Sequence, residues 1–234
     1  MPGLVFNGSN QSCIGNAISW NYPRMIVAWS KSTLSTATSS SIVESGIEAS
    51  ANEFNRLQTG GLNNFQAVSR TNSTFTVTGL PRIRFSDIWM LSGALFLSDS
   101  SRYILESDVF VSSESTSAAL TQTPNRFTIG ASSRGANYFS GSIAHVAVYQ
   151  PTNLNDAISM ILRLYRYTPD KVEPSKLLNY WPDCTTDLKG GINLTPQGSP
   201  TVDTSDIPQL TNSLLSGGSA GFTGIEGISR SLGT

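Results

Sequence analysis

Short apolar runs separated by turn residues recur along the chain, and this feature constrains the fold most. The runs are "GLVFNG", "RMIVAWSKS", "FQAVSR", "STFTVTGL", "IWMLSGALFL", "RYILES", "DVFVSS", "RFTIGAS", "GSIAHVAVYQ", "LLNYWPD" and "INLTPQG". Many short strands at regular spacing are typical of an antiparallel sandwich or barrel. The sequence therefore predicts an all-β protein built as an antiparallel β-sandwich.

Two of these runs indicate how the strands bury their side chains. "RMIVAWSKS" alternates between two faces, which are Met25, Val27 and Trp29 against Ile26, Ala28 and Ser30. "IWMLSGALFL" is nearly all apolar, which indicates a strand buried on both faces, with Gly93 allowing a bulge or a close contact. We expect Trp29, Trp89 and Phe96 in the core.

One segment breaks the β pattern. "PTNLNDAISMILRLYRYTPDKV" places apolar residues at helical spacing, namely Leu154, Ile158, Ile161, Leu162 and Tyr165. Asn153 or Asn155 can cap its start, and Asp156 complements the helix dipole in the first turn. Because Pro169 ends the pattern, we predict one helix of about three turns near residues 154–166, covering one end or face of the sandwich.

His145, the only histidine, lies in the run "GSIAHVAVYQ". Strict alternation would group it with Ile143, Ala147 and Tyr149 on one face, against a second face formed by Ser142, Ala144, Val146, Val148 and Gln150. Since no second histidine can join it in a metal site, we interpret His145 as a structural residue of a strand.

Charge and composition exclude several classes of partner. The 234-residue chain has a formal net charge of −1 with 13% charged residues, so no basic patch indicates nucleic-acid binding. No apolar run approaches the ~20 residues of a membrane span. The start, "MPGLVFNGSN", lacks the basic and apolar regions of a signal peptide. Cys13 and Cys184 are the only cysteines, and they can either pair or stay as free thiols.

The order of the motifs resembles a known family. "IGAS…YFSGSIAHVAVYQPTNLNDAISMIL" is similar to the closing segment of laminin-G-like, concanavalin A-like jelly rolls, and "GLVFNGSNQSCIG", "RMIVAWSKS" and "IWMLSGALFLSDSSRYILES" resemble earlier strands of that family. The similarity covers roughly residues 3–165. It departs from the family at a hairpin tip, where Glu106-Ser107 replaces the usual Asn-Gly or Asp-Gly. The resemblance implies a jelly-roll β-sandwich.

A narrower resemblance follows the helix. "TPDKVEPSKLLNYWPDCTTDLKGGINLTPQGSPTVDTSDIP" is similar to the C-terminal extension of such domains in virion proteins of tailed phages. It implies a structural protein of a bacteriophage virion, a capsid decoration or fibre-base subunit that assembles in the host cytoplasm. Its partners would be other virion proteins, either the major capsid protein or copies of itself in an oligomer or larger assembly.

Relatives of this fold include glycosidases, whose chemistry needs two carboxylates across a cleft. The family's Glu-x-Asp-x-x-Glu pattern is matched only in part by "ESDVFV", because Val111 occupies the position of the third carboxylate. We therefore interpret Glu106 and Asp108 as exposed charges at a hairpin tip. No catalytic, cofactor-binding or metal-binding set is predicted, and the protein is expected not to be an enzyme.

The alternative function is a carbohydrate-binding, lectin-like module of a tail fibre or cell surface, with host-surface glycans as partners. Such sites combine an exposed aromatic platform with polar groups. The candidate loops hold Asn137 and Tyr138 in "RGANYF", and Asp99 with Arg102 in "LSDSSR". Each loop is also a common turn composition.

The expected organisation is one β-sandwich over residues 1–213, with C-terminal strands within 177–202, followed by a glycine-rich arm over 214–234. Ordering so many glycines costs conformational entropy, which contacts must offset. We expect the arm to bind a neighbouring subunit through its apolar residues, which are Leu214, Leu215, Phe222, Ile225 and Ile228.

Overall fold

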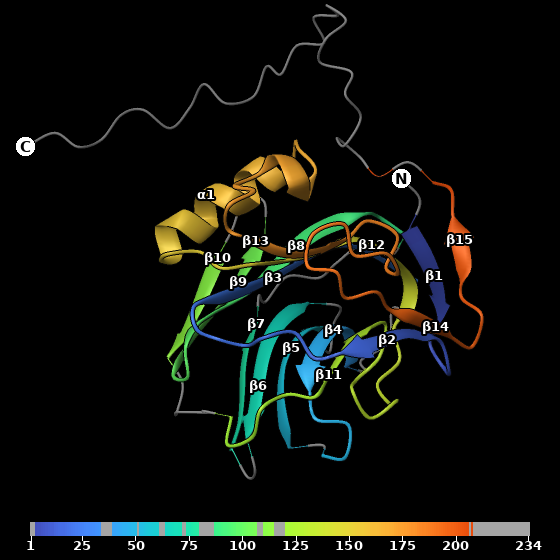
Figure 1. Cartoon of the computed structure of the whole chain (residues 1–234), viewed down its shortest axis with the longest axis horizontal. Coiled ribbons are helices and arrows are strands. Elements are labelled where there is room, and N and C mark those ends of the chain that lie inside the picture. Colours follow the sequence, from blue (N-terminus) through green and yellow to red (C-terminus); the bar gives the residue numbers. More distant parts are fainter. Residues whose placement is uncertain are drawn as a thin grey trace, which may run out of the picture.

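The computed structural model describes residues 3–33, 39–50, 52–60, 64–71, 74–79, 87–106, 110–114, 120–205 and 207. These residues form two antiparallel sheets that pack face to face, as Figure 1 shows. This confirms the predicted antiparallel β-sandwich. The residues at 214–234, and therefore the predicted arm, lie outside the described part of the chain.

Sheet A takes strands from both ends of the chain. Its order is β10 (Phe110–Glu114), β9 (Ser101–Glu106), β8 (Met90–Ser98), β3 (Arg24–Ser32), β12 (Ser140–Tyr149), β1 (Gly3–Asn7) and β15 (Thr201–Asp203). A further strand, β13 (Leu177–Trp181), pairs with the later part of β12.

Sheet B contains three strands that the apolar runs did not include, β2, β4 and β5. Its order is β14 (Thr195–Gln197), β2 (Ser12–Asn16), β11 (Arg126–Ile129), β4 (Ser40–Gly46), β5 (Glu53–Thr59), β6 (Phe65–Thr71) and β7 (Thr74–Gly79). Strand β5, "EFNRLQT", carries polar residues on both faces, so its hydrophobic alternation is weak.

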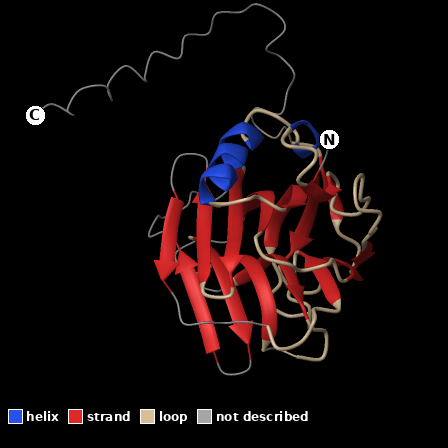
Figure 2. Ribbon diagram, turned by 60° about the vertical axis from the view of Figure 1, so that its left-hand side comes forward, coloured by secondary structure: helices blue, strands red, loops and turns tan. Residues whose placement is uncertain are grey.

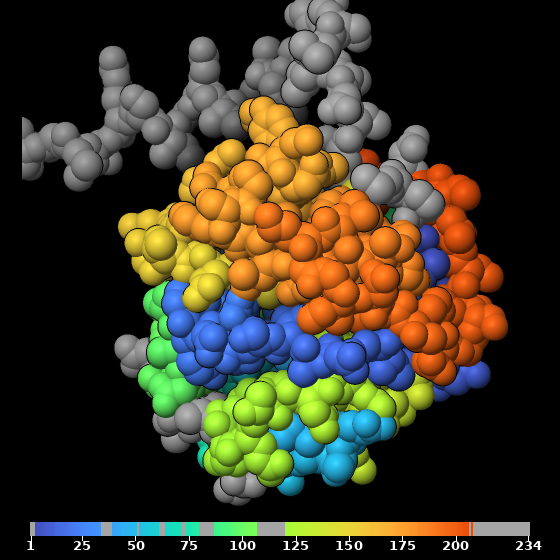
Figure 3. Space-filling model, in the orientation of Figure 1, coloured from blue at the N-terminus to red at the C-terminus, as the bar shows by residue number. Residues whose placement is uncertain are grey.

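The sandwich has a third layer on one side. Helix α1 (Leu154–Leu164) packs on the face of sheet A that points away from sheet B (Figures 1 and 2). Figure 3 shows the helix region on one side of the molecule and, on the opposite side, the light-blue residues of the turn that follows β4. No described helix covers the outer face of sheet B.

The predicted faces of β3 are confirmed. Ile26 and Ala28 belong to the core between the two sheets, whereas Val27 and Trp29 belong to the cluster beneath α1. The three aromatic residues expected in the core are buried, namely Trp29, Trp89 and Phe96.

Strand β8 is buried on both faces, as its sequence indicated. Phe96 faces sheet B, and Leu95 faces α1. A Cβ atom on Gly93 would lie 3.2 Å from Val27 Cγ1 and 3.3 Å from Ile161 Cδ1. Glycine at this position therefore allows α1 to lie close against the sheet.

Helix α1 begins at the first of the two starts that the sequence allowed. Asn153 is the N-cap, and its side-chain oxygen accepts a hydrogen bond of 3.0 Å from the backbone N–H of Asp156. The helix ends at Leu164, and Pro169 begins a separate 3₁₀ turn, Pro169–Lys171. In the described part of the chain, no helix has the length and apolar character needed to cross a bilayer.

Strand β12 departs from the predicted alternation at His145. Ala144 pairs with Trp29 and Ala147 with Val27, so β12 uses one residue more than β3 over this interval. The extra residue forms a β-bulge, and His145 has a φ of 49°, in the left-handed region. The bulge reverses the faces that follow it. Ile143, Val146 and Val148 face sheet B, whereas Ala144, Ala147 and Tyr149 face α1. The predicted grouping was therefore wrong beyond Ala144.

Candidate functional site

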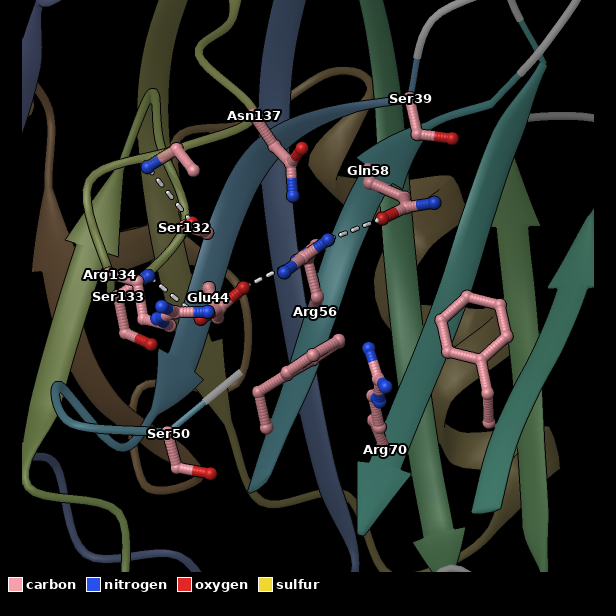
Figure 4. Close-up of a pocket in the computed structure, with 13 residues that line it drawn as sticks. Ser39, Glu44, Ser50, Arg56, Gln58, Arg70, Ser132, Ser133, Arg134 and Asn137 are labelled. Atoms are coloured by element: carbon pink, nitrogen blue, oxygen red, sulfur yellow. Dashed lines mark hydrogen bonds and ion pairs between the residues drawn. The ribbon is translucent and has the colours of Figure 1, made fainter. Parts of the chain in front are cut away.

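A pocket of about 230 Å³ lies on the outer face of sheet B, over β4 to β7 (Figure 4). It is lined by Ser39, Glu44, Ser50, Phe54, Arg56, Gln58, Arg70, Phe75, Ser132, Ser133, Arg134, Ala136 and Asn137. The strand register explains this grouping, because side chains paired across neighbouring strands share a face. Glu44 pairs with Arg56, and Phe54 pairs with Arg70, which pairs in turn with Phe75.

A network of side chains forms the floor of the pocket. Arg56 Nε donates to Glu44 Oε2 in an ion pair, and Arg56 Nη1 donates to Gln58 Oε1 at 2.9 Å. Gln58 Nε2 donates to Gln66 Oε1 at 2.8 Å. The guanidinium carbon of Arg56 also lies 4.0 Å from the centre of the Phe54 ring. Since Glu44 and Arg56 are only 1% and 6% exposed, this pair is fixed and largely desolvated.

The loop between β11 and β12 forms one wall of the pocket. The backbone N–H of Ser133 donates to Glu44 Oε1 at 2.8 Å, and Arg126 Nη1 donates to the Ser133 carbonyl at 2.8 Å. At the other end of the loop, the Asn137 carbonyl accepts a bond of 2.8 Å from the backbone N–H of Ser41. These bonds to β4 and β11 hold the wall in place.

Three groups in the pocket are available to a ligand. Arg70 is half-buried, and it forms no hydrogen bond to a described residue, even through its buried Nε. Phe75 is 55% exposed, and its ring centre lies 6.0 Å from the guanidinium carbon of Arg70. Arg134 is exposed on the loop wall, and neither Arg70 nor Arg134 forms an ion pair with a described carboxylate. The pocket thus combines an apolar ring with unneutralised cations.

The structure separates the two loops predicted to bind sugar. Asn137 lies on the pocket wall and is exposed, and Tyr138 follows it on the same loop, half-buried. Asp99 is half-buried in the turn between β8 and β9. Arg102 is not on a loop but within β9, fully buried between the sheets. Its Nε donates to Ser69 Oγ at 3.1 Å and its Nη2 to the Asp99 carbonyl at 2.6 Å. The prediction that Arg102 lies on a surface loop was therefore wrong.

Glu106 is also placed differently from the expectation. It is the last residue of β9 and is 7% exposed, so it is not an exposed charge at a hairpin tip. Glu106 lies two residues after Ile104 in β9 and therefore points to the same side, that of the core between the sheets. Asp108 lies outside the described residues. Among the described residues, no group of three or more His, Cys, Asp or Glu side chains could hold a metal ion.

Both cysteines are buried free thiols. They belong to the core between the sheets, and Cys184 Sγ lies 3.2 Å from the carbonyl of Ile143. Burial raises the pKa of Cys13 to about 12, and the carboxylate of Asp183 adds to the shift. The thiolate that would react as a nucleophile is therefore disfavoured.

His145 is buried on the bulge of β12, away from the pocket. Its Nδ1 lies 2.6 Å from the hydroxyl of Tyr180, and its Nε2 has no partner. Burial disfavours the charged imidazolium and lowers the pKa of His145 to about 4. This is consistent with the predicted structural role.

The low pKa of His145 predicts a pH-dependent stability. The unfolded chain binds a proton near pH 6.5, whereas the folded chain does not until about pH 4. Stability should therefore fall as pH drops from about 6.5 to about 4, by up to about 3 kcal/mol. Urea unfolding measured across this range tests the expectation. In the variant His145→Asn, asparagine tolerates the positive φ and the only imidazole is removed. The free energy of unfolding of this variant should therefore fall less steeply between pH 6.5 and pH 4. An unchanged slope in this variant would contradict the assignment.

Comparison with known proteins identifies the fold. No protein-family model and no curated protein matches the sequence. A heptameric SAP-like pentraxin from Limulus polyphemus superposes with a TM-score of 0.59 at 9% identity, covering 89% of this chain and 97% of the pentraxin. The chain has the jelly-roll β-sandwich fold.

Two other solved structures place this fold in different molecular contexts. The Ruminococcus gnavus IT-sialidase CBM40, solved bound to α2,3-sialyllactose, matches with a TM-score of 0.52 at 14% identity, over 68% of this chain and 94% of that one. The enzymatically active domain of tailspike protein 2 of bacteriophage CBA120 matches with a TM-score of 0.57 at 17% identity, over 78% of this chain but 30% of that one. The jelly roll is thus shared with lectin-like proteins and with part of a phage tailspike.

The pocket itself was missed by the sequence interpretation, apart from Asn137. Its floor comes from β4 and β5, neither of which was predicted as a strand. The available signal was local: Ile42 and Val43 are β-branched, and the charged residues Glu44 and Arg56 flank a turn at residues 48 and 49. That signal indicates a hairpin of β4 and β5. It does not indicate that Glu44 and Arg56 lie on the outer face of sheet B.

Proposed function

We propose that this protein binds carbohydrate in the pocket on the outer face of sheet B. The observation that carries the proposal is the exposed ring of Phe75 beside Arg70, whose Nε has no hydrogen-bond partner, on a sheet face that no described helix covers. A sugar ring has an apolar face that can pack on an aromatic side chain and hydroxyls that need polar partners. The pocket offers both kinds of contact.

Further hydrogen-bonding groups line the same pocket as the Phe75 ring. Ser39, Ser50 and Asn137 line the pocket and are partly or fully exposed. These side chains can donate and accept, as sugar hydroxyls require. The fixed Glu44–Arg56 pair below them supports the site without needing to rearrange when a ligand enters.

The fold comparison supports the same proposal at a coarse level. The CBM40 structure was solved with a bound oligosaccharide, and its jelly roll corresponds to 68% of this chain. Identity is too low to transfer any binding residue. The support for this chain therefore comes from its own pocket.

We further propose that the site binds without turnover. Glycoside hydrolysis uses two carboxylates facing each other across the scissile bond. Glu44 is the one carboxylate among the described lining residues, and it is held by Arg56 and by the Ser133 backbone. Release of sugar from a bound glycan, lost in Glu44→Gln, would contradict this.

Removing the ring of Phe75 should weaken glycan binding. A half-exposed phenylalanine that a sugar covers contributes about 1.4 kcal/mol by burial, so Phe75→Ala should raise the Kd at least about tenfold. Binding to a glycan microarray, followed by calorimetry with the best ligand, measures the change.

Ile88→Ala is the matched control, because Ile88 is a similarly exposed apolar residue, 50% exposed, outside the pocket lining. Its Kd should be unchanged. Equal losses in the two variants, or glycan binding that Phe75→Ala leaves intact, would locate the site elsewhere. If the array shows no glycan binding at all, the proposed function is wrong.

A second candidate function is a structural subunit of a phage virion, bound to the major capsid protein or to copies of itself. The observation that favours it is the match to the tailspike domain of bacteriophage CBA120, which covers 78% of this chain. Labelling purified particles with an antibody against this protein, followed by electron microscopy, tests it. Unlabelled particles would remove this candidate.

A further inference from the structure

We infer that the glycan bound in the pocket is acidic, and that Arg70 binds its carboxylate or sulfate group. The inference rests on the proposed function, because it specifies the chemical class of ligand for the same site. It follows from the charges in the pocket, the absence of an ion pair or hydrogen bond to Arg70 from the described residues, and the position of the Phe75 ring.

The charges in the pocket do not balance. Glu44, the carboxylate among the described lining residues, is neutralised by its ion pair with Arg56. Arg70 and Arg134 then contribute positive charge without a described carboxylate partner. The chain as a whole carries a net charge of −1, so this excess is local and does not follow from composition. A local excess of positive charge in a concave site favours an anionic ligand.

Of the three arginines, Arg70 is the one poised to bind an anion in the pocket. Arg56 is already engaged by Glu44 and Gln58, and it lies over the Phe54 ring. Arg134 is exposed on the wall, where water competes for its donors. Arg70 Nε is buried without any hydrogen-bond partner, which costs free energy in the empty pocket. The side chain as a whole is only half-buried, and its two terminal nitrogens are neither buried nor hydrogen-bonded to a described residue. A guanidinium binds a carboxylate or sulfate through two parallel hydrogen bonds.

The Phe75 ring and Arg70 suit an acidic sugar in particular. The two residues are directly paired across β6 and β7, with 6.0 Å between the ring centre and the guanidinium carbon. A sugar that packs on the ring therefore places its substituents within reach of the guanidinium. An acidic substituent would form a charge-assisted bond there, whereas a hydroxyl would form a weaker neutral one.

The test first applies the full chain to an array of glycans in matched sets, in which a neutral glycan and its acidic counterparts differ by one acidic group. Calorimetry with lactose, sialyllactose and sulfated lactose then measures the affinities. We expect the acidic members to bind at least tenfold more tightly than their neutral counterparts, and this preference to shrink as salt is raised. Arg70→Gln should remove the preference. Arg70→Lys should restore part of it, because lysine keeps the charge but loses the paired donors.

Arg166→Gln is the matched control, since it removes the same charge from an exposed position after α1, outside the pocket lining. It should keep the preference, and unchanged melting temperatures should confirm that all variants are folded. A preference for sialylated over sulfated members, or the reverse, identifies the acidic group.

The other outcomes separate this inference from the proposed function. If neutral glycans bind as tightly as acidic ones and Arg70→Gln leaves their affinity unchanged, the inference is overturned and carbohydrate binding stands. If an acidic preference persists in Arg70→Gln, the anion is bound elsewhere and the inference is again overturned. Binding to no glycan on the array overturns both.

Discussion

Trp29→Ala is expected to lower the free energy of unfolding by about 3–5 kcal/mol, because it leaves a large cavity in a closely packed layer. Trp29 is 2% exposed and faces α1 from the centre of sheet A. Its ring stacks on Tyr165, with 5.7 Å between the ring centres. The substitution therefore removes both burial and an aromatic contact that holds the end of α1 on the sheet.

Denaturant unfolding monitored by far-UV circular dichroism measures this loss. Trp29→Phe keeps an aromatic ring in the same place and should cost less than half as much. Tyr167→Ala is the surface control, because Tyr167 is 52% exposed, and it should change stability by less than about 0.5 kcal/mol. A cost under about 1 kcal/mol for Trp29→Ala would show that the packing of α1 on β3 is not as described.

Asp187→Ala should be comparably damaging, with a loss of about 4 kcal/mol, for a different physical reason. Asp187 is 8% exposed, and its carboxylate accepts hydrogen bonds from four backbone N–H groups and one side-chain amide. The donors are the N–H groups of Tyr180, Lys189, Gly190 and Ile192 and the Nδ2 of Asn179. Alanine would leave these donors unsatisfied in and around the turn "DLKGG".

The same residue gives a distinct pH signature. Burial alone would raise the pKa of Asp187, but hydrogen bonds from Tyr180 and Asn179 outweigh it and hold the pKa below its ordinary value. The stabilisation is thus present above about pH 4 and lost as pH falls through the folded-state pKa.

Asp87→Asn is the control for Asp187→Ala, because Asp87 is exposed and asparagine tolerates its positive φ of 62°. It should leave the urea midpoint unchanged. If Asp187→Ala unfolds at nearly the wild-type urea concentration, the carboxylate does not organise this turn.

The sequence predicted best the parts of the fold in which one physical signal dominates. The faces of β3, the double burial of β8 and the cap of α1 at Asn153 follow from apolar periodicity and from a single capping oxygen. Each depends on residues close together in the chain. The short range of these signals is the reason that they can be recognised without the partner strands.

The candidate site could not be predicted in the same way, because it depends on tertiary packing. Arg56 and Arg102 both lie in strands and are both buried, yet one forms the floor of the outer pocket and the other binds Ser69 between the sheets. Whether such an arginine side chain lies on the outer face or between the sheets is decided only by how its strand is placed in the sandwich. Similarly, one inserted residue at His145 reverses the faces of β12, and alternation alone gives no sign of such a bulge.

The placement of the first and last strands has a consequence for how the protein is made. Strand β1 (Gly3–Asn7) forms hydrogen bonds with β12 and β15, and β2 (Ser12–Asn16) forms them with β11 and β14. On the ribosome, β1 and β2 must therefore wait until residues from Arg126 onward have been synthesised before they can pair with their described partner strands. Such distant pairings fold slowly and leave strand edges open meanwhile. We therefore expect nascent chains that end before β11 to be captured by chaperones, and release to follow the synthesis of β15.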